Sequence, residues 1–402
     1  MLNSSLALLA SIAGILILLR LKGGAGLSIF AGSLIISLLV LPLPSIPELM
    51  LRALLSHQTL QLLAIVASAL TLSNLMETKG LLTNLAATME RIGPKLALHL
   101  TPAIIGLVPM PAGALVSATA VRDLVSRMGL TPEKATFINY WFRHIWEYSL
   151  PVYPAIITAS VLLSVQLSSM VITLLPMTAL ATALAAISTH RMLKLKNTTT
   201  TREKMSRNLA YNLLRASWPV LLLVSLVLPG LDAVVAFPLT LALLALQQRA
   251  KWPELKKAFK YGLDPKILLL LYAVMLYKAT IESSGAAHVL LSDMETIRLP
   301  ALAILAALPF LLGFATGVSM AFVGIAFPLL VPFMSLDSGV NSYALLVAYT
   351  SGVVGFLVSP VHLCLILSAE YFRADLAGVY RYILPPAMAI EAIAVLVYCI
   401  AA

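Results

Sequence analysis

Charge is scarce in this chain of 402 residues, because Asp, Glu, Lys and Arg make up only 11% of it. Hydrophobic residues account for 60%. A soluble domain has too little interior to hide that much apolar surface. The composition therefore excludes an ordinary soluble protein and predicts a polytopic membrane protein.

Cysteine is scarce as well, and both cysteines, Cys364 and Cys399, lie in apolar segments. They suggest neither a disulfide framework nor a metal site, and no metal or organic cofactor is expected. The formal net charge is +10, but Lys and Arg collect in the cytoplasmic loops of membrane proteins. The positive charge therefore predicts no nucleic-acid partner.

A short signature recurs in both halves of the sequence. Tyr140 precedes Pro151 by eleven positions, Tyr349 precedes Pro360 by eleven, and valine follows each proline. Upstream, ETKG at 77–80 matches ESSG at 282–285. The offsets, 205 and 209, are close to half of the chain, so we infer an internal duplication of the kind found in secondary transporters.

Apolar segments then predict an all-α fold with ten transmembrane helices. The expected crossings are 3–19, 27–43, 60–76, 136–160, 167–189, 215–231, 233–249, 267–283, 341–367 and 379–401. The first is kept as a crossing because no basic region precedes it, as a signal peptide would require. Two further apolar stretches, 96–124 and 299–335, are interrupted by proline or glycine and predict re-entrant hairpins.

The positive-inside rule sets the orientation. With the N-terminus outside, 23 of the 27 Lys and Arg residues fall on the inner side. Each half has five crossings, so the two repeats are inverted and the C-terminus is also outside. We expect repeat one at 1–190, a cytoplasmic linker at 191–214 and repeat two at 215–402. Segments 80–92 and 286–296 are expected along the interface of a plasma or inner membrane.

The hairpin tips are the first candidate site, since a new half-helix directs unpaired N–H groups into the membrane centre, where they stabilise an anion. The alternative is that these small residues serve helix packing. The candidates are Pro111, Ala112, Gly113 and Ser117 at the first tip and Thr316, Gly317 and Ser319 at the second.

The broken crossings 136–160 and 341–367 form the second candidate site. Pro151 and Pro360 each remove a backbone donor, and the freed carbonyls would suit a coupling cation. A simple kink is the alternative. In the second half, Thr350 and Ser359 are expected to shape the substrate pocket.

A charged cluster is the third and sharpest feature. Asn139, Arg143 and Glu147 are spaced by four and would share one helix face. Arg143 lies about 13 Å deeper than Lys134 at helical rise, where an unpaired arginine costs at least ~2.5–3.5 kcal/mol. Either Arg143 and Glu147 form a structural pair, or Arg143 binds a substrate anion while Glu147 or His144 titrates.

Farther out, Lys278 and Glu282, four residues apart, predict an interfacial ion pair rather than a site.

The stretches PMPAGALVSA, NYWFRHIWEYSLP, GFATG and SPVHLCLILSAEYF, with the predicted layout, resemble the ion transporter superfamily. That group includes gluconate permeases, C4-dicarboxylate carriers, arsenite permeases and citrate carriers. The resemblance implies a scaffold part and a transport part, a homodimer, and movement of an organic or inorganic anion with Na⁺ or H⁺.

We therefore expect a secondary active transporter of a small anion, working by alternating access in the lipid bilayer. The first alternative is a carrier of a neutral solute, with Arg143 and Glu147 as a structural pair. An intramembrane enzyme using Glu147 and His144 as acid and base, and a passive channel, are weaker alternatives.

Overall fold

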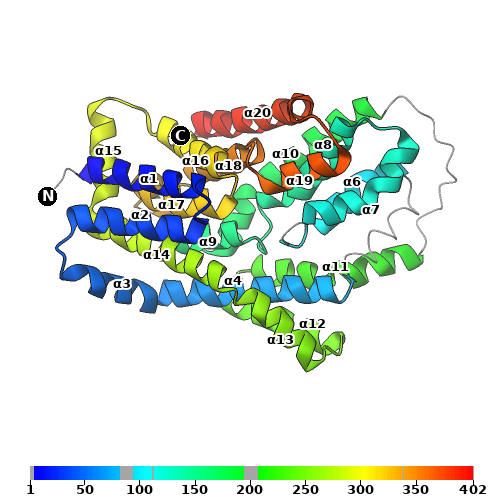
Figure 1. Ribbon diagram of the computed structural model, residues 1–402, viewed down its shortest axis with the longest axis horizontal. Helices are drawn as coiled ribbons and strands as arrows, with labels where there is room; N and C mark the ends of the chain where they lie inside the picture. The colour runs from blue at the N-terminus through cyan, green and yellow to red at the C-terminus, as the bar shows by residue number, and fades with distance from the viewer. Residues whose placement is uncertain (1–3, 82–93, 111–112, 194–206, 338, 402) are drawn as a thin grey trace.

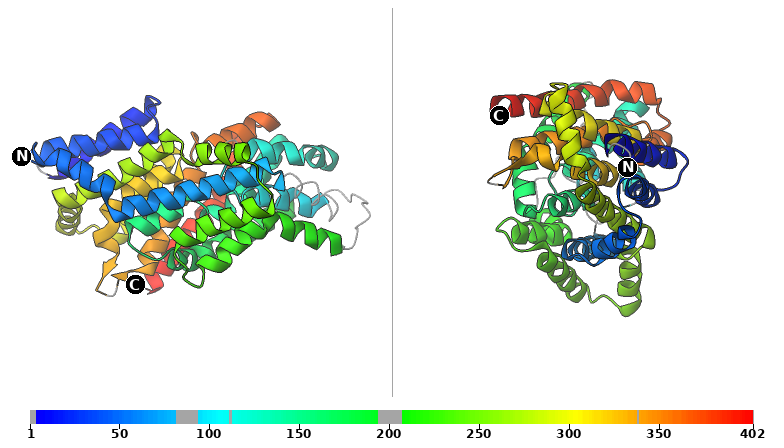
Figure 2. Two further views of the ribbon diagram at one scale, coloured as in Figure 1. Left: turned by 90° about the horizontal axis from the view of Figure 1, so that it is seen from below. Right: turned by 90° about the vertical axis from the view of Figure 1, so that its left-hand side faces the viewer.

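The computed structural model describes residues 4–81, 94–110, 113–193, 207–337 and 339–401. These residues are nearly all helical, and most helices run roughly along the long axis of the molecule (Figures 1 and 2). The predicted helical class is confirmed. Pro111, Ala112 and most of segment 80–92 lie outside the described residues.

Four helices come first in the described part of the chain, and a single residue separates the third from the fourth. They are α1 (Ser4–Arg20), α2 (Ala25–Val40), α3 (Ser45–Leu55) and α4 (His57–Thr78). Sequence analysis assigned no helix to α3, which lies between two predicted crossings. Ser56 separates α3 from α4, and its hydroxyl accepts the backbone N–H of Thr59 at 3.2 Å, as an N-cap does.

The next elements contain the first proline break. They are α6 (Pro94–Ile105), α7 (Gly113–Met128), α8 (Pro132–His144), the 3₁₀ turn η1 (Ile145–Glu147), α9 (Pro154–Leu162) and α10 (Leu167–Met192). Residues 148–153, which include Pro151, are not helical. Helix α9 then starts on Pro154, because proline fits the first helical position.

The middle of the chain forms α11 (Arg207–Val227), α12 (Ala233–Gln247), α13 (Trp252–Gly262) and α14 (Pro265–Ser284). Helix α11 begins inside the segment predicted as a linker, and α13 lies between two predicted crossings. The side chains of Asp232 and Asp264 cap α12 and α14. Lys79 and Glu254 pair at 2.6 Å and join α4 to α13.

The last part contains the second break. Its elements are α15 (Ala286–Thr296), α16 (Ala301–Thr316), α17 (Ser319–Met334), strands β1 (Ser335–Leu336) and β2 (Gly339–Val340), α18 (Ser342–Leu357), α19 (Leu363–Phe372) and α20 (Leu376–Ala401). Pro360 lies between α18 and α19. Helix α15 crosses the ends of its neighbours, at the left of Figure 1.

Helices α8 and α18 form the centre of the molecule. Every residue from 135 to 144 and from 344 to 357 is buried, and a helix buried on all sides belongs to a core. Helix α8 packs against α6, α19 and α20, and α18 packs against α16 and α20. The Tyr140 hydroxyl donates to the Leu357 carbonyl at 2.8 Å, which holds the two breaks side by side.

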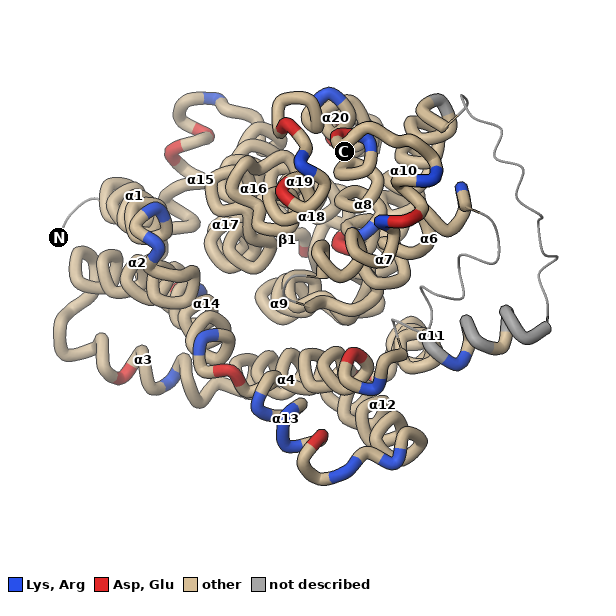
Figure 3. The backbone as a smooth tube through the Cα atoms, turned by 45° about the vertical axis from the view of Figure 1, so that its right-hand side comes forward, with Lys and Arg blue, Asp and Glu red and all other residues tan. Residues whose placement is uncertain are grey.

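Few charged residues lie in the middle of this bundle, and Arg143 and Glu147 are among the buried exceptions. In Figure 3, Lys and Arg gather near helix ends, while α16, α17 and α18 carry no charge. Within the described residues, four helical stretches are long and apolar enough to cross a membrane: His57–Thr78, Leu167–His190, Trp252–Ser284 and Leu376–Ala401. The other apolar helices are shorter, so the ten-crossing layout stays a prediction.

Candidate functional site

Arg143 is the centre of the candidate site. It lies on the last turn of α8 and is only 4% exposed. Its Nη2 donates to the Met110 carbonyl at 3.2 Å, on the segment that joins α6 to α7. Its Nη1 lies 3.3 Å from His144 Nε2 and 3.6 Å from Cys364 Sγ. One guanidinium therefore contacts the first hairpin, its own broken helix and the start of α19.

The first hairpin leaves room for that guanidinium at Gly113. A Cβ atom on Gly113 would lie 2.3 Å from Arg143 Nη2, far inside van der Waals contact. Any larger residue at Gly113 must displace the arginine, so the glycine at the predicted tip sets the position of the charge.

Glu147 does not pair with Arg143 in the described part of the chain. The ion pairs formed there are Arg52–Glu48, Lys79–Glu254 and Lys278–Glu282. The i,i+4 argument assumed a continuous α-helix, but residues 145–147 form a 3₁₀ turn. With three residues per turn, residue i+4 leaves the face of residue i. Glu147 is buried, and its Oε2 has no hydrogen-bond partner among the described residues.

Two histidines meet beside Arg143. His144 Nε2 lies 3.2 Å from His362 Nε2, although the residues are 218 positions apart. His362 also places its Nδ1 2.7 Å from the carbonyl of Gly317, at the second predicted tip. This contact joins the first broken helix to the second and to its hairpin.

The second tip is shaped around His362. Gly317 ends α16 in the left-handed conformation, with φ of 62°, and a Cβ there would lie 2.9 Å from the His362 backbone nitrogen. Ser359 donates to the Phe314 carbonyl at 2.6 Å and so ties the second break to α16. The Thr316 hydroxyl donates to Leu312, and Ser319 is half-buried at the start of α17.

Asn139 and Ser117 form a separate group one turn away from Arg143. The Asn139 amide donates to the Ala114 carbonyl and to the Ser368 hydroxyl, both at 3.0 Å. Ser117 donates to the same Ala114 carbonyl at 3.1 Å. Asn139 Oδ1 is buried and has no partner in the described part of the chain. This amide therefore clamps α7 and α19 onto α8.

Thr350 lies in the centre of α18, and its buried hydroxyl has no partner among residues that the structure describes. Its neighbour Ser351 donates to Glu391 of α20 at 2.6 Å. Sequence analysis did not single out Glu391, Cys364 or His362 as site residues. His362 and Cys364 directly follow Pro360, so the break itself was the available signal.

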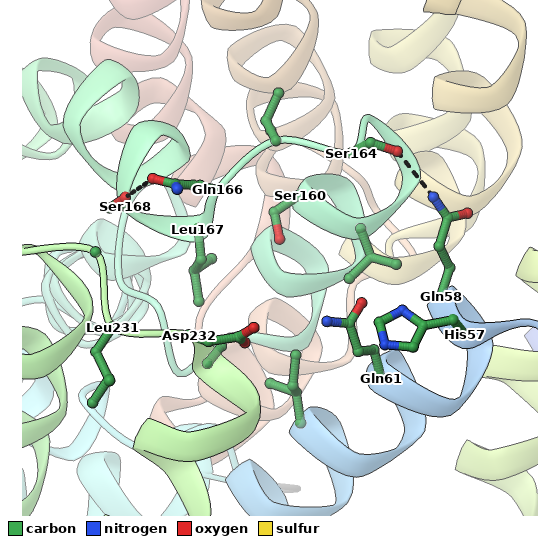
Figure 4. A pocket seen from close by; sticks show the side chains of 15 residues that line it. His57, Gln58, Gln61, Ser160, Ser164, Gln166, Leu167, Ser168, Leu231 and Asp232 are labelled. Carbon is green, nitrogen blue, oxygen red and sulfur yellow. Dashed lines mark hydrogen bonds between the residues drawn. The ribbon is translucent and has the colours of Figure 1, made fainter.

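A polar cavity of about 480 Å³ opens at another place, between the start of α4, the end of α9 and the starts of α10 and α12. Figure 4 shows side chains such as Gln58, Gln61 and Asp232 around it. Gln58 donates to Ser164 at 2.9 Å and accepts from Lys278 at 2.7 Å. Lys278 lies 3.8 Å from Glu282, the pair expected from sequence.

Comparison with known proteins places the chain by family and by fold. Residues 2–401 match the family described as protein of unknown function (DUF401). The chain belongs to the DUF401 family. No curated protein matches the sequence. The fold is similar to the crystal structure of the YdaH transporter of Alcanivorax borkumensis, with a TM-score of 0.66 and 13% identity. The match covers 98% of this chain and 97% of that one.

Proposed function

We propose that this DUF401 protein is a secondary active transporter of a small anion, an organic acid or an oxyanion. The observation that carries the proposal is the buried Arg143 guanidinium, for which the described residues supply no carboxylate within ion-pair distance. A buried cation that no carboxylate contacts is costly, so a bound anion would stabilise the site.

The surroundings of Arg143 suit a bound solute. The guanidinium donates to the Met110 carbonyl and fills the space beside Gly113, which has no side chain of its own. Its Nε is buried and has no partner in the described residues, so one donor is available to an anion. The likeness to a solved transporter supports a carrier fold.

The proposal also includes the repeats, the oligomeric state, the orientation of the termini and the coupling ion. We propose two inverted repeats, 1–190 and 215–402, which alternate access around the two breaks, in a homodimer of the ion transporter type. The termini lie outside, and H⁺ or Na⁺ drives uptake. Support comes from the two proline breaks, the contact between them and the concentration of basic residues at helix ends.

The test is uptake into liposomes that contain the purified protein, with gluconate, phosphate and sulfate as probes that cross lipid poorly. Arg143→Gln keeps hydrogen-bonding groups but removes the charge. A charge-assisted hydrogen bond contributes about 1.5–3 kcal/mol, so we expect uptake to fall about 10- to 100-fold. Arg52→Gln, at an exposed pair on α3, is the matched control.

Other outcomes identify the alternatives. Equal uptake by Arg143→Gln and wild type would reject the anion site and favour a neutral solute. Currents far above carrier rates would favour a channel. Turnover of a lipid or peptide that depends on Glu147 and His144 would favour an enzyme.

A further inference from the structure

The contact between His144 and His362, at the centre of the molecule, restricts which of their ring nitrogens can carry a hydrogen. His144 and His362 are 2% and 8% exposed, and their rings meet edge to face with centroids 5.1 Å apart. His144 Nδ1 lies 2.6 Å from the Tyr140 carbonyl, and His362 Nδ1 lies 2.7 Å from the Gly317 carbonyl. A carbonyl oxygen only accepts, so each Nδ1 must carry a hydrogen.

Neutral rings in that tautomer leave a lone pair on each Nε2. The two Nε2 atoms are 3.2 Å apart, and two lone pairs at that separation repel. One added proton turns the repulsion into an N–H···N hydrogen bond of acceptable length. The geometry therefore has a place for three N–H hydrogens on two imidazoles, which gives the pair one positive charge.

Arg143 decides which ring carries the added proton. A guanidinium only donates, and its Nη1 lies 3.3 Å from His144 Nε2. That nitrogen must therefore accept, so the added proton sits on His362 Nε2, and its N–H shares the one lone pair of His144 Nε2 with the longer contact from Arg143. We infer that His144 and His362 form a proton-binding pair, and that this proton is the coupling ion of the transporter proposed above.

The surrounding charges make proton binding depend on the anion. The titratable side chains in contact with the pair are Arg143, Tyr140 and Cys364. Beyond them, Glu147 and Tyr153 interact electrostatically with Arg143, and Tyr380 interacts with Tyr140. Tyr140 and Tyr380 donate to backbone carbonyls and stay neutral. Even an ionised Glu147 only offsets Arg143, so a protonated pair leaves one uncompensated positive charge in a buried site, which is unfavourable.

A monovalent anion at Arg143 removes that imbalance. Proton and anion therefore bind with mutual reinforcement, and each raises the affinity of the other by the same factor. The pair also bridges the two broken helices. Without the proton the rings repel across this interface, and with it they hold the interface together. Protonation and anion binding would thus favour the same arrangement of the two breaks.

A metal ion is the competing occupant. His144, His362 and Cys364 offer donor atoms that all lie within 4.8 Å of one another, a set that suits soft ions such as Zn²⁺. Arg143 Nη1 already lies against two of these donors. A cation would have to displace that guanidinium, whereas a proton on His362 leaves it in place.

The first experiment tests the pair without transport. Protein labelled with ¹⁵N-histidine is followed by NMR from alkaline to mildly acidic pH, with and without phosphate. We expect a hydrogen-bonded imidazolium signal that disappears in His144→Asn and in His362→Asn. The signal should remain in His99→Asn, a half-buried histidine on α6. Two histidines that stay neutral throughout, or titrate independently, would overturn the inference.

Zinc binding is the second experiment. Binding of one Zn²⁺ per chain that is abolished by Cys364→Ser, retained by Cys399→Ser and accompanied by shifts at both Nε2 atoms would assign the pair to a metal and overturn the proton. No specific Zn²⁺ binding is the expected result.

Transport assays distinguish the inference of proton coupling from the proposed anion transport itself. In sodium-free liposomes, an inward proton gradient should drive gluconate or phosphate uptake. Apparent affinity should rise by up to about tenfold per unit fall in pH, the limit for one linked proton. His362→Asn should lose this dependence on the proton gradient. Uptake driven by Na⁺ and indifferent to the proton gradient would overturn the inference and leave the anion carrier intact. An NMR-visible shared proton without uptake of any anion would reject the carrier instead.

Discussion

The guanidinium of Arg143 occupies the space that a side chain on Gly113 would need, since a Cβ there would lie 2.3 Å from Nη2. Gly113→Ala should therefore push the arginine away from the Met110 carbonyl. We expect anion uptake to fall, because the added methyl group moves the charge of Arg143. Uptake of gluconate, phosphate and sulfate into liposomes is the measurement.

A double-mutant cycle separates this effect from a general loss of packing. If Gly113→Ala acts through Arg143, adding it to Arg143→Gln should cause little further loss, because interacting sites are not additive. Fully additive losses would show that the glycine serves hairpin packing alone.

Gly317, at the second tip, and Gly285, between α14 and α15, provide a matched pair of glycines. Both have φ near 60°, at 62° and 64°, but only Gly317 lies against another segment, the His362 backbone. Alanine at either position should cost about 1–2 kcal/mol for the left-handed conformation. Thermal unfolding in detergent should show a loss for both variants and a larger loss for Gly317→Ala, whose Cβ would also lie 2.9 Å from the His362 backbone nitrogen.

Only Gly317→Ala should also displace His362. The NMR signal of His362 and the uptake of anion should therefore change in Gly317→Ala and not in Gly285→Ala. Equal effects of the two substitutions on uptake would mean that the close approach at Gly317 has no functional part.

Asn139 is expected to act through its amide donors. Asn139→Asp keeps the shape but places an acceptor against the Ala114 carbonyl, to which the amide now donates at 3.0 Å. Leaving buried polar groups unpaired costs about 1–3 kcal/mol each, so the unfolding midpoint should drop. Ser368→Ala removes only one acceptor and should cost less, and a larger loss in Ser368→Ala would contradict the clamp.

Gln58 joins α4 to two other elements, because it accepts from Lys278 of α14 and donates to Ser164 after α9. Gln58→Ala should leave Lys278 with only the longer contact to Glu282 and lower stability by about 1 kcal/mol. Gln61→Ala, on the same cavity wall, is the control. Identical melting curves for the two variants would show that the bridge contributes nothing.

Much of the local structure follows from short-range chemistry. Proline removes a donor and clashes with the preceding turn, so the breaks near Pro151 and Pro360 were readable in the sequence. The cap signals at Asp232 and Asp264 are equally local. Helix α3 was not predicted, because its 11 residues are too few to cross a membrane.

For Arg143 and Glu147, sequence spacing alone did not predict the contacts. Their spacing implies one face only if the helix continues, and the chain tightens into a 3₁₀ turn after His144. The i,i+4 rule therefore gave the wrong neighbour. The neighbours of Arg143 are Met110, His144 and Cys364, and only His144 is close in sequence.

By itself, the sequence determined the membrane environment, the helical class and the positions where helices break, because hydrophobicity and proline geometry act over a few residues. Tertiary structure alone decided that His362 meets His144 and that Gly113 makes room for Arg143. Those contacts depend on how whole helices pack against α8 and α18, and packing between distant segments leaves no periodic trace in a single chain.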